Sequence, residues 1–457
     1  MHQLIARISL THGWFPVVAQ VSAAVLLGLA VGWRSPRWRR RMLPVLVAAA
    51  AVLAAVTYWY IDSIGVAGNA GPPQLWAWIA STVLAVGVAV LGWMSARWWR
   101  RMASVAAVGA CALACALTLN VWVGYFPTVH AMWNQLTSGP LPGQTDRLTV
   151  TKMQLAHVRP ANGVLVPVTI ESVSGFSHRG ELVYLPPAWF ASSPPPELPA
   201  IMMIGSQLNT PADWLRAGNV LGIVDGFAAA HGGNAPVLVF VDATGSFTND
   251  TECVNGVRGN AADHLTKDVV PYLISDFGVR SDRDGWGIAG WSMGGTCAVD
   301  LTLMHPDMFR SFVDIAGDLR PNTGDKTQTI SRLFGGDADA WAAYDPITIM
   351  GRHGPYRDVT AWFEVPTAQR GRTTHDPAVN PEAQDVAATT LCDAARAVAI
   401  ACSVQTAPGR HDWVFAANAF ASALPWLAGQ LHTPGVDRTL LPTSTLSQTA
   451  SVQAAPH

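Results

Sequence analysis

The sequence is poor in charged residues, which make up only 13% of its 457 positions. That share is about half of what is usual for soluble proteins. The net charge of −2 gives no strongly basic or acidic surface, which argues against nucleic acid as a partner. Charge is scarcest between residues 14 and 126, where almost every charged residue is an arginine in one of two short clusters. Beyond residue 146 the composition is that of a globular protein.

Long apolar runs fill this charge-poor part of the chain. Each is about 19–25 residues long, enough for a helix to cross a hydrocarbon core of about 30 Å. A signal peptide would give a single, shorter run. The sequence therefore predicts an α-helical membrane domain at residues 1–130 and a linker at residues 131–147. The four predicted transmembrane helices occupy residues 15–33, 43–61, 75–94 and 102–126.

The two arginine clusters predict how this domain lies in the membrane. One follows the first run and the other follows the third, whereas the loop at residues 62–74 has no Lys or Arg. The positive-inside rule places both arginine loops in the cytoplasm. We therefore expect a multi-pass protein of the cell membrane whose N-terminus and C-terminal domain are extracytoplasmic. The clusters also form a repeat, "GWRSPRWRRRM" at residues 32–42 and "GWMSARWWRRM" at residues 92–102, which favours two copies of one helical hairpin.

After the linker, short β-rich runs alternate with helical patterns. Alternation of this kind favours an α/β fold with a mostly parallel central sheet and helices on both faces. We expect this domain at residues 148–432 and a disordered tail at residues 433–457. The predicted strands are residues 148–158, 166–172, 180–185, 200–205, 237–242, 287–289, 311–315, 360–365 and 402–406. The predicted helices are residues 213–230, 262–277, 293–305, 381–400 and 414–431.

The stretch "GWSMG" at residues 290–294 has the G-x-S-x-G pattern of a nucleophile elbow. A predicted strand precedes Ser292 and a predicted helix follows it, which is the setting that an α/β-hydrolase elbow requires. We therefore predict Ser292 as the nucleophile of a serine hydrolase. The Met293 N–H at the helix N-terminus is expected to stabilise an oxyanion. The Ser206 N–H, which follows Gly205 after another strand, is predicted as the second oxyanion donor.

The general base and its acid should follow Ser292 in the chain, as in α/β-hydrolases. His411 lies between the last predicted strand and the last predicted helix, so we predict it as the base. The acid should lie after the strand at residues 360–365, where Asp376 is the first acidic residue. It would orient the imidazole and stabilise its protonated form. The alternatives that remain open are Glu382, Asp385 and Asp318.

Four of the six cysteines lie in the domain that we place outside the cell, where disulfides persist. Cys253, Cys297, Cys392 and Cys402 are therefore disulfide candidates, and a Cys253–Cys297 bridge would brace the rim of the active site. Four cysteines allow three connectivities, between which the sequence does not choose. There is no Cys-x-x-Cys pair, so we expect no metal site, and the chemistry needs no cofactor.

Three segments carry a family resemblance: "HLTKDVVPYL" at 264–273, "GIAGWSMGGTCAVDLTLMHPDMFRSFVDIAGDLRPN" at 287–322 and "GRHDW" at 409–413. They resemble the esterase D group, and in particular the antigen 85 mycolyltransferases, over most of residues 148–432. Membrane-anchored esterases of actinobacterial type fit best. The resemblance implies Ser292 and His411 as nucleophile and base, and Met293 and Ser206 as oxyanion donors. It also implies Trp413 as a neighbour of the base, and we expect Gly205, Trp291 and Trp413 to contact the substrate.

The sequence thus predicts a membrane-embedded extracytoplasmic serine esterase. Its substrate would be a lipid or another acyl ester of the cell envelope, cleaved through an acyl-enzyme. An acyltransferase of the mycolyl type, which passes the acyl group to an envelope acceptor, is the alternative enzyme. The alternative that is not an enzyme is a hydrolase fold without catalytic activity that serves as a binding module.

Overall fold

A computed structural model describes residues 8–32, 35–65, 71–94, 96–130, 132–133, 141–367 and 383–446. The chain divides into two compact units. The first, here called the helical unit, comprises Met1–Gly65 and Asn69–Ser138. The second, here called the α/β unit, comprises Val66–Gly68 and Gly139–His457.

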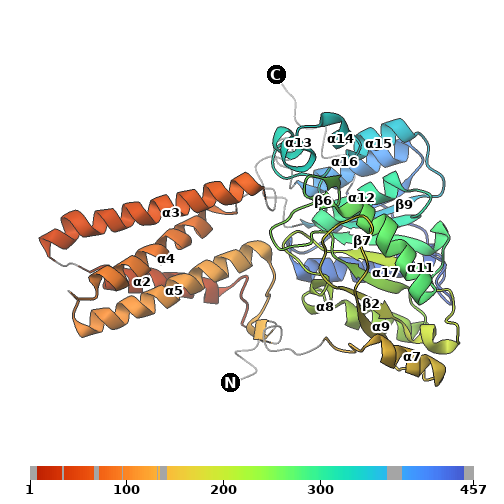
Figure 1. The fold of residues 1–457 in the computed structure, drawn as a ribbon, viewed down its shortest axis with the longest axis horizontal. Helices are drawn as coiled ribbons and strands as arrows, with labels where there is room; N and C mark the ends of the chain where they lie inside the picture. The colour runs from red at the N-terminus through yellow and green to blue at the C-terminus, as the bar shows by residue number, and fades with distance from the viewer. Residues whose placement is uncertain are drawn as a thin grey trace. The chain divides into compact units, whose positions relative to one another are not determined.

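The helical unit contains the four apolar helices expected from the sequence (Figure 1). They are α2 (Trp14–Val31), α3 (Leu43–Ile64, extended at its start by the π-helical turn η1, Trp38–Met42), α4 (Pro73–Gly92) and α5 (Trp98–Val123). By length and composition each could cross a membrane. Only 17–33% of each apolar window is buried inside the protein. Most of the apolar surface therefore points outward, as contact with lipid requires.

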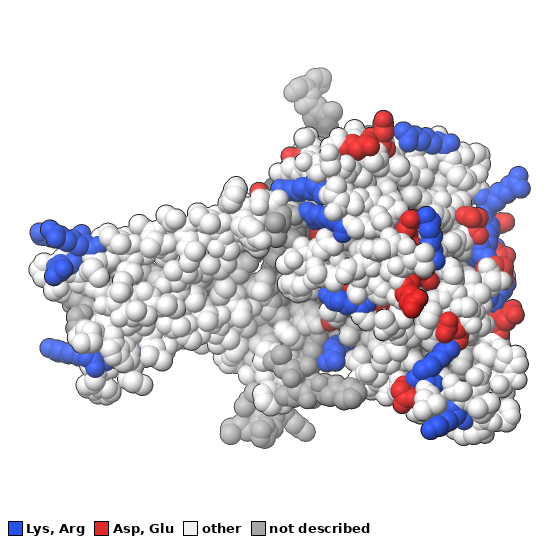
Figure 2. Space-filling view, in the orientation of Figure 1, with Lys and Arg blue, Asp and Glu red and all other residues white. Residues whose placement is uncertain are grey.

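Small side chains hold these helices together. The buried core of the unit includes Ala23, Ala85, Ala107 and Cys111. Small residues let helix backbones approach closely, which matters in lipid because the hydrophobic effect does not drive helices together there. Figure 2 shows Lys and Arg side chains gathered at one end of the helical unit, whereas the middle of its visible face carries no charged side chain. Both arginine loops lie at this end, since a Cβ placed on Gly32 would be 2.7 Å from the Arg100 guanidinium carbon.

The α/β unit is built on an eight-stranded sheet of order β1-β2-β4-β3-β7-β8-β9-β10. The pairs β1–β2 and β2–β4 are antiparallel, and all other neighbours are parallel. This is the mostly parallel α/β sheet that the strand-helix alternation predicts. The strands are β1 (Val164–Val168), β2 (Glu181–Leu185), β3 (Ala200–Ile204), β4 (Val237–Val241), β7 (Trp286–Trp291), β8 (Ser311–Ile315), β9 (Thr360–Pro366) and β10 (Ala401–Ala407). A separate two-stranded ribbon joins β5 (Asn255–Gly256) to β6 (Gly259–Asn260).

Helices cover both faces of the sheet because successive residues of a strand point to opposite sides. On β7, a Cβ at Gly287 would meet Leu427 of α17, whereas Ile288 lies in the core that contains Cys297 and Leu301 of α12. The helices are α7 (Arg147–Leu155), α8 (Asp213–Arg216), α9 (Val220–Ala230), α10 (Ala261–Asp263), α11 (Val270–Phe277), α12 (Met293–Met304), α13 (Lys326–Phe334), α14 (Ala338–Ala342), α15 (Pro346–His353), α16 (Gln384–Ala397) and α17 (Trp413–Gln430). Shorter helical turns are η2 (Pro187–Ala191), η3 (His264–Val269) and η4 (Arg283–Gly285).

One predicted strand is wrong. Residues 148–158 alternate β-branched and polar residues, but Arg147–Leu155 form α7. The side chain of Asp146 caps this helix by accepting a hydrogen bond from the Thr149 N–H at 2.8 Å. An N-cap of this kind stabilises a helix by about 1 kcal/mol, so a local cap outweighs the weak strand pattern.

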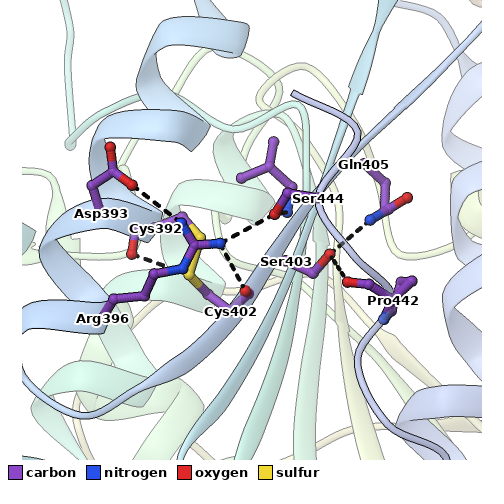
Figure 3. The surroundings of a disulfide bond; sticks show 9 residues. Cys392, Asp393, Arg396, Cys402, Ser403, Gln405, Pro442 and Ser444 are labelled. Carbon is purple, nitrogen blue, oxygen red and sulfur yellow. Dashed lines mark hydrogen bonds and ion pairs between the residues drawn. A yellow bond between two sulfur atoms is a disulfide. The ribbon is translucent and has the colours of Figure 1, made fainter. Parts of the chain in front are cut away.

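The tail expected to be disordered from residue 433 is ordered over residues 433–446 (Figure 3). We call residues 440–446 the strap, since they lie along the edge strand β10. The Thr445 N–H donates to Val404 O at 2.9 Å, and the Val404 N–H donates to Ser444 Oγ at 3.0 Å. Arg396, beside the Cys392–Cys402 disulfide, also donates to Ser444 Oγ. The strap thus satisfies backbone groups that an edge strand would leave open.

Deleting residues 440–457 should destabilise the α/β unit and promote aggregation, because the edge of β10 would lose its cover. Each lost hydrogen bond is worth about 1 kcal/mol, and each kcal/mol shifts the unfolding temperature by about 2–4 °C. Thermal unfolding of the full chain in detergent measures this shift. Deleting only residues 447–457 is the matched control, because it leaves the strap in place. Equal unfolding temperatures for the two deletions would contradict a stabilising role for the strap.

Candidate active site

Ser292 stands between β7 and α12 on a strained backbone. Its φ of 57° and ψ of −120° lie in a region that a residue with a side chain rarely adopts. The Ser292 N–H donates to Ile315 O of β8 at 2.9 Å, and the Ser292 carbonyl accepts the Gly295 N–H at 2.8 Å. These bonds fix the sharp turn between strand and helix that the G-x-S-x-G pattern predicts.

Glycines around Ser292 allow the chain to pack closely enough for this turn. A Cβ on Gly290 would lie 1.7 Å from Gly294 O, and one on Gly294 would lie 2.2 Å from Ile204 O of β3. Both separations are far below van der Waals contact. The elbow therefore requires glycine at both positions, and its helix starts directly against the end of β3.

His411 lies against Ser292. Its Nε2 is 3.0 Å from Ser292 Oγ, which is hydrogen-bond reach for a nucleophile and its base. The imidazole packs on the indole of Trp291, with ring centroids 4.2 Å apart. Trp413 packs in turn beside Trp291 and Trp214. The structure thus brings together two residues that are 119 positions apart in the sequence.

Both tryptophans are largely buried in this structure, and their expected contact with the substrate stays a prediction. Trp291 is 3% exposed and Trp413 is 1% exposed. Trp413 is the first residue of α17, and Asp412 caps this helix by accepting the Phe415 N–H at 3.0 Å. The indoles therefore support the ring of His411 from its buried side.

A small polar cleft opens beside the elbow. Met293 and Ser206 both line it, together with Gly205, Asn209, Thr210, Val241, Asp242, Ala243 and Thr244. The Met293 N–H is the first of α12 and has no acceptor within the helix. The Ser206 N–H donates to Asn209 Oδ1 at 3.2 Å. An oxyanion that used the Ser206 donor would thus have to compete with the Asn209 side chain.

A family comparison can now be set against this geometry. The family model described as "Putative esterase" matches residues 177–427, more than half of the chain. The chain belongs to this esterase family. The match covers the elbow, the cleft and His411, and it confirms the esterase family expected from the motifs.

Individual relatives are similar to the chain over part of its length or at low sequence identity. An uncharacterized protein of Corynebacterium glutamicum is 35% identical over 188 residues, which are 41% of this chain and 44% of the relative. The chain thus aligns with less than half the length of this relative. An S-formylglutathione hydrolase from Agrobacterium tumefaciens is 16% identical, with a TM-score of 0.48 over 60% of this chain and 97% of the hydrolase. The Mycobacterium tuberculosis protein MPT51 is 18% identical, with a TM-score of 0.41 over 58% and 98%.

No motif in the sequence indicates the ion pair that lies beside the cleft. Arg179 forms a bidentate ion pair with Asp242, with Nε–Oδ2 at 2.9 Å and Nη2–Oδ1 at 2.6 Å. Burial raises the pKa of Asp242, but hydrogen bonds and charge from Arg179 outweigh it and leave the pKa below its ordinary value. Asp242 therefore stays ionised, and Arg179 also donates to Asn209 O and Thr244 Oγ1. Arg179 thus ties the two cleft segments at residues 205–210 and 241–244 together.

The acid of the triad stays a prediction. Asp376 and Glu382 lie outside the described residues. Asp385 lies in the first turn of α16. Asp318 accepts hydrogen bonds from the side-chain amides of Asn322 at 2.8 Å and Gln384 at 3.4 Å, so these amides orient its carboxylate.

The four candidate cysteines form two disulfides, Cys253–Cys297 and Cys392–Cys402. Cys297 lies on α12, and Cys253 lies in the segment between β4 and β5. The first bridge therefore ties the loop that follows the cleft wall to the helix that carries Met293. This is the bracing that the sequence left as one of three connectivities.

A buried carboxyl beneath the elbow should make stability depend on pH. Burial raises the pKa of Asp314 from 3.8 to about 7, despite the Gly317 N–H that it accepts. Between these values the folded protein keeps a proton that the unfolded chain has lost, so stability falls as pH rises. Asp314→Asn cannot ionise. It should be more stable than wild type at about pH 8, with a smaller difference at about pH 4.

Thermal unfolding of the full chain in detergent at both pH values measures the effect. Asp276→Asn, an exposed carboxyl on α11, is the matched control and should behave as wild type. A stability difference for Asp314→Asn that is the same at both pH values would contradict a raised pKa.

Proposed function

We propose that this chain is a serine esterase in which Ser292 attacks the ester carbonyl. The observation that supports this most strongly is the 3.0 Å approach of His411 Nε2 to Ser292 Oγ at a strained elbow. The family match supports ester chemistry at the same place. In this reaction the Oγ–carbon bond forms while His411 takes the hydroxyl proton. His411 then gives that proton to the alkoxide as the ester C–O bond breaks. The alcohol departs, and the acyl group stays on Ser292 as an acyl-enzyme.

The cleft beside Ser292 supplies the remaining roles. The Met293 N–H faces the cleft at the positive end of the α12 dipole, where negative charge is stabilised. We assign Met293 and Ser206 as the oxyanion donors, with Ser206 exchanging Asn209 Oδ1 for the oxyanion. Asp376 is assigned as the acid that holds the His411 imidazole, with Glu382, Asp385 and Asp318 as its competitors. Water then attacks the acyl-enzyme with His411 as base, and the carboxylic acid product is released from Ser292.

The expected substrates are lipid or other acyl esters of the cell envelope. The four apolar helices support this assignment, since they would hold the esterase at a membrane surface where such esters are concentrated. An envelope alcohol in place of water would give acyl transfer by the same acyl-enzyme. Product analysis with and without an added alcohol separates the two reactions. The polar side chains that line the cleft, Asp242, Asn209 and Thr244 among them, suit a polar group next to the ester.

Labelling of the full chain by a fluorophosphonate tests the nucleophile. Wild type should label stoichiometrically, because the probe traps an activated serine. Ser292→Ala should abolish labelling, and His411→Ala should slow ester turnover by about 10⁴-fold or more. Asp376→Asn should cost about 10⁴-fold. Loss of a comparable size in Glu382→Gln, Asp385→Asn or Asp318→Asn would reassign the acid.

Matched controls are present in the chain. Ser275, on α11, donates to Tyr272 O, and His432 is exposed after α17. Ser275→Ala and His432→Ala should leave labelling and turnover unchanged. A folded wild-type protein that neither labels nor turns over an ester panel would support a binding module instead.

We also propose that the α/β unit is extracytoplasmic. The two arginine loops at one end of the helical unit support this orientation, since such loops stay in the cytoplasm. Single cysteines placed at Ser246 and at Arg39 in intact cells should then react differently with a membrane-impermeant maleimide. Ser246 should react without permeabilisation and Arg39 only after it. The reverse pattern would place the α/β unit in the cytoplasm.

A further inference from the structure

Two histidines and a glutamate from separate segments meet inside the α/β unit. His178 precedes β2, Glu181 is the first residue of β2, and His264 is the first residue of η3. One ligand atom from each residue lies within 4.8 Å of the others. Glu181 is 1% exposed and His264 is fully buried, while the His178 side chain is 8% exposed. The three side chains are therefore largely shielded from water.

Each histidine has one ring nitrogen held from outside the cluster. His264 Nδ1 is 3.1 Å from Asp268 Oδ2, and this oxygen also accepts the hydroxyls of Ser172 and Ser174. His178 Nε2 is 2.7 Å from Ile170 O. Histidines that bind metals almost always donate their other N–H to a carboxylate or a backbone carbonyl. The outer partners thus orient both rings so that His178 Nδ1 and His264 Nε2 are the nitrogens nearest Glu181.

With one charged ring, His264 between the carboxylates of Glu181 and Asp268, three of the four contacts between a histidine nitrogen and an oxygen can be hydrogen bonds, and one is left without a proton. His264 Nε2 is 3.0 Å from Glu181 Oε1, and His178 Nδ1 is 2.9 Å from Arg179 O. Since every nitrogen faces an oxygen acceptor, full hydrogen bonding would need two imidazolium rings. The two rings are stacked with centroids 4.2 Å apart, so two cations would lie face to face in a buried place, which is costly.

The Glu181 carboxylate also lacks full hydrogen bonding. Its Oε1 contacts His264 Nε2 and, at 3.4 Å, the Asp242 N–H. Its Oε2 is buried and accepts no hydrogen bond from any residue that the structure describes; its recorded ion-pair contact is with His178 Nδ1, at the long distance of 3.8 Å. A buried carboxylate oxygen without a hydrogen bond carries a large desolvation cost. A cation beside it would remove that cost.

We propose that His178 Nδ1, His264 Nε2 and the Glu181 carboxylate bind one divalent metal ion, with zinc favoured. Two imidazoles and a carboxylate are a common zinc set, with bonds of about 2.0–2.2 Å. Ligand atoms on a tetrahedral ion of this size are about 3.4 Å apart. The cluster, with its atoms at most 4.8 Å apart, would contract by about 1 Å to close around the ion. Because the two rings are stacked with an interplanar angle of 24°, they would also have to turn toward one another so that both nitrogen lone pairs point at the ion. The ion would take the place of the protons between the two rings and Glu181, while Asp268 and Ile170 remain the outer partners of the rings.

This ion would be structural for the cleft and is independent of the acyl-enzyme chemistry. Glu181 meets the backbone of Asp242, and Asp242 lines the cleft. The ion would therefore tie η3 and the segment before β2 to the cleft wall. The prediction that the chain has no metal site was based on cysteine spacing, which carries no information about this cluster.

Zinc titration of the full chain tests the proposal. The protein is purified in detergent without a polyhistidine tag, stripped with a chelator and titrated with Zn²⁺ against a chromogenic competitor. One equivalent should bind and raise the unfolding temperature. His178→Gln and Glu181→Gln should lose this equivalent. Asp268→Asn should weaken binding by about 10–100-fold, as expected for an outer partner.

The matched control is His231→Gln. His231 is half-buried, and its Nδ1 also faces a backbone carbonyl, Phe227 O at 2.8 Å. This variant should bind zinc as wild type does. Fluorophosphonate labelling of each sample reports whether the esterase unit is folded, separately from metal content.

Two results would overturn the proposal. One is wild-type protein that labels normally and binds no zinc at micromolar concentrations. The other is zinc binding of unchanged affinity in both His178→Gln and Glu181→Gln. Substitution with Co²⁺ identifies the second case, since coordination by Cys111 or Cys115 would give a thiolate charge-transfer band that the proposed nitrogen and oxygen ligands cannot give.

Discussion

The close approach of α12 to the ends of β3 and β8 is the constraint on which the site depends. At Gly294 and Gly295 a Cβ would come within 2.2 Å of Ile204 O and of Asp314 Oδ1, respectively. Only glycine fits between these elements, so α12 begins at the sheet edge and Ser292 takes its strained conformation there. The same approach places Met293 at the cleft, and the burial of Asp314 raises the pKa of its carboxyl to about 7.

The parts of this site that follow from local sequence could be predicted. A strand, a glycine-flanked serine and a helix define the elbow within a few residues, and chain order then points to His411. The carboxyl ends of parallel strands meet at one edge of a sheet, which explains why Ser206, Ser292 and His411 converge there. Trp413 could be predicted as a neighbour of the base but not as a buried one, because it packs on Trp214, which comes from a distant part of the chain.

Features that depend on distant pairings could not be predicted. Arg179 meets Asp242 across 63 residues, and Glu181 meets His264 across 83. Neither pair has a characteristic spacing, since the first depends on the antiparallel placement of β2 beside β4 and the second on the position of η3 beside the start of β2. The strap could not be predicted for a related reason. Its residues are polar and lack periodicity, which is typical of a disordered tail, but the open edge of β10 supplies hydrogen-bond partners for them. In the case of α7, a single capping carboxylate decided between strand and helix.

The two units form their backbone hydrogen bonds and bury their side chains in different ways. This difference explains why the candidate catalytic residues lie in the α/β unit. In the helical unit every helix satisfies its own backbone, and small residues such as Ala85 and Ala107 provide the contacts. Such packing leaves apolar side chains outward, and the hydrogen-bonded side chains of Ser9, Thr11 and His12 lie before α2, outside the packed helices. The α/β unit instead buries carboxylates, histidines and a strained serine within a close-packed sheet, where hydrogen bonds fix each of them. Reactive groups can be held at defined distances only in the second arrangement, and the esterase family match lies entirely within it.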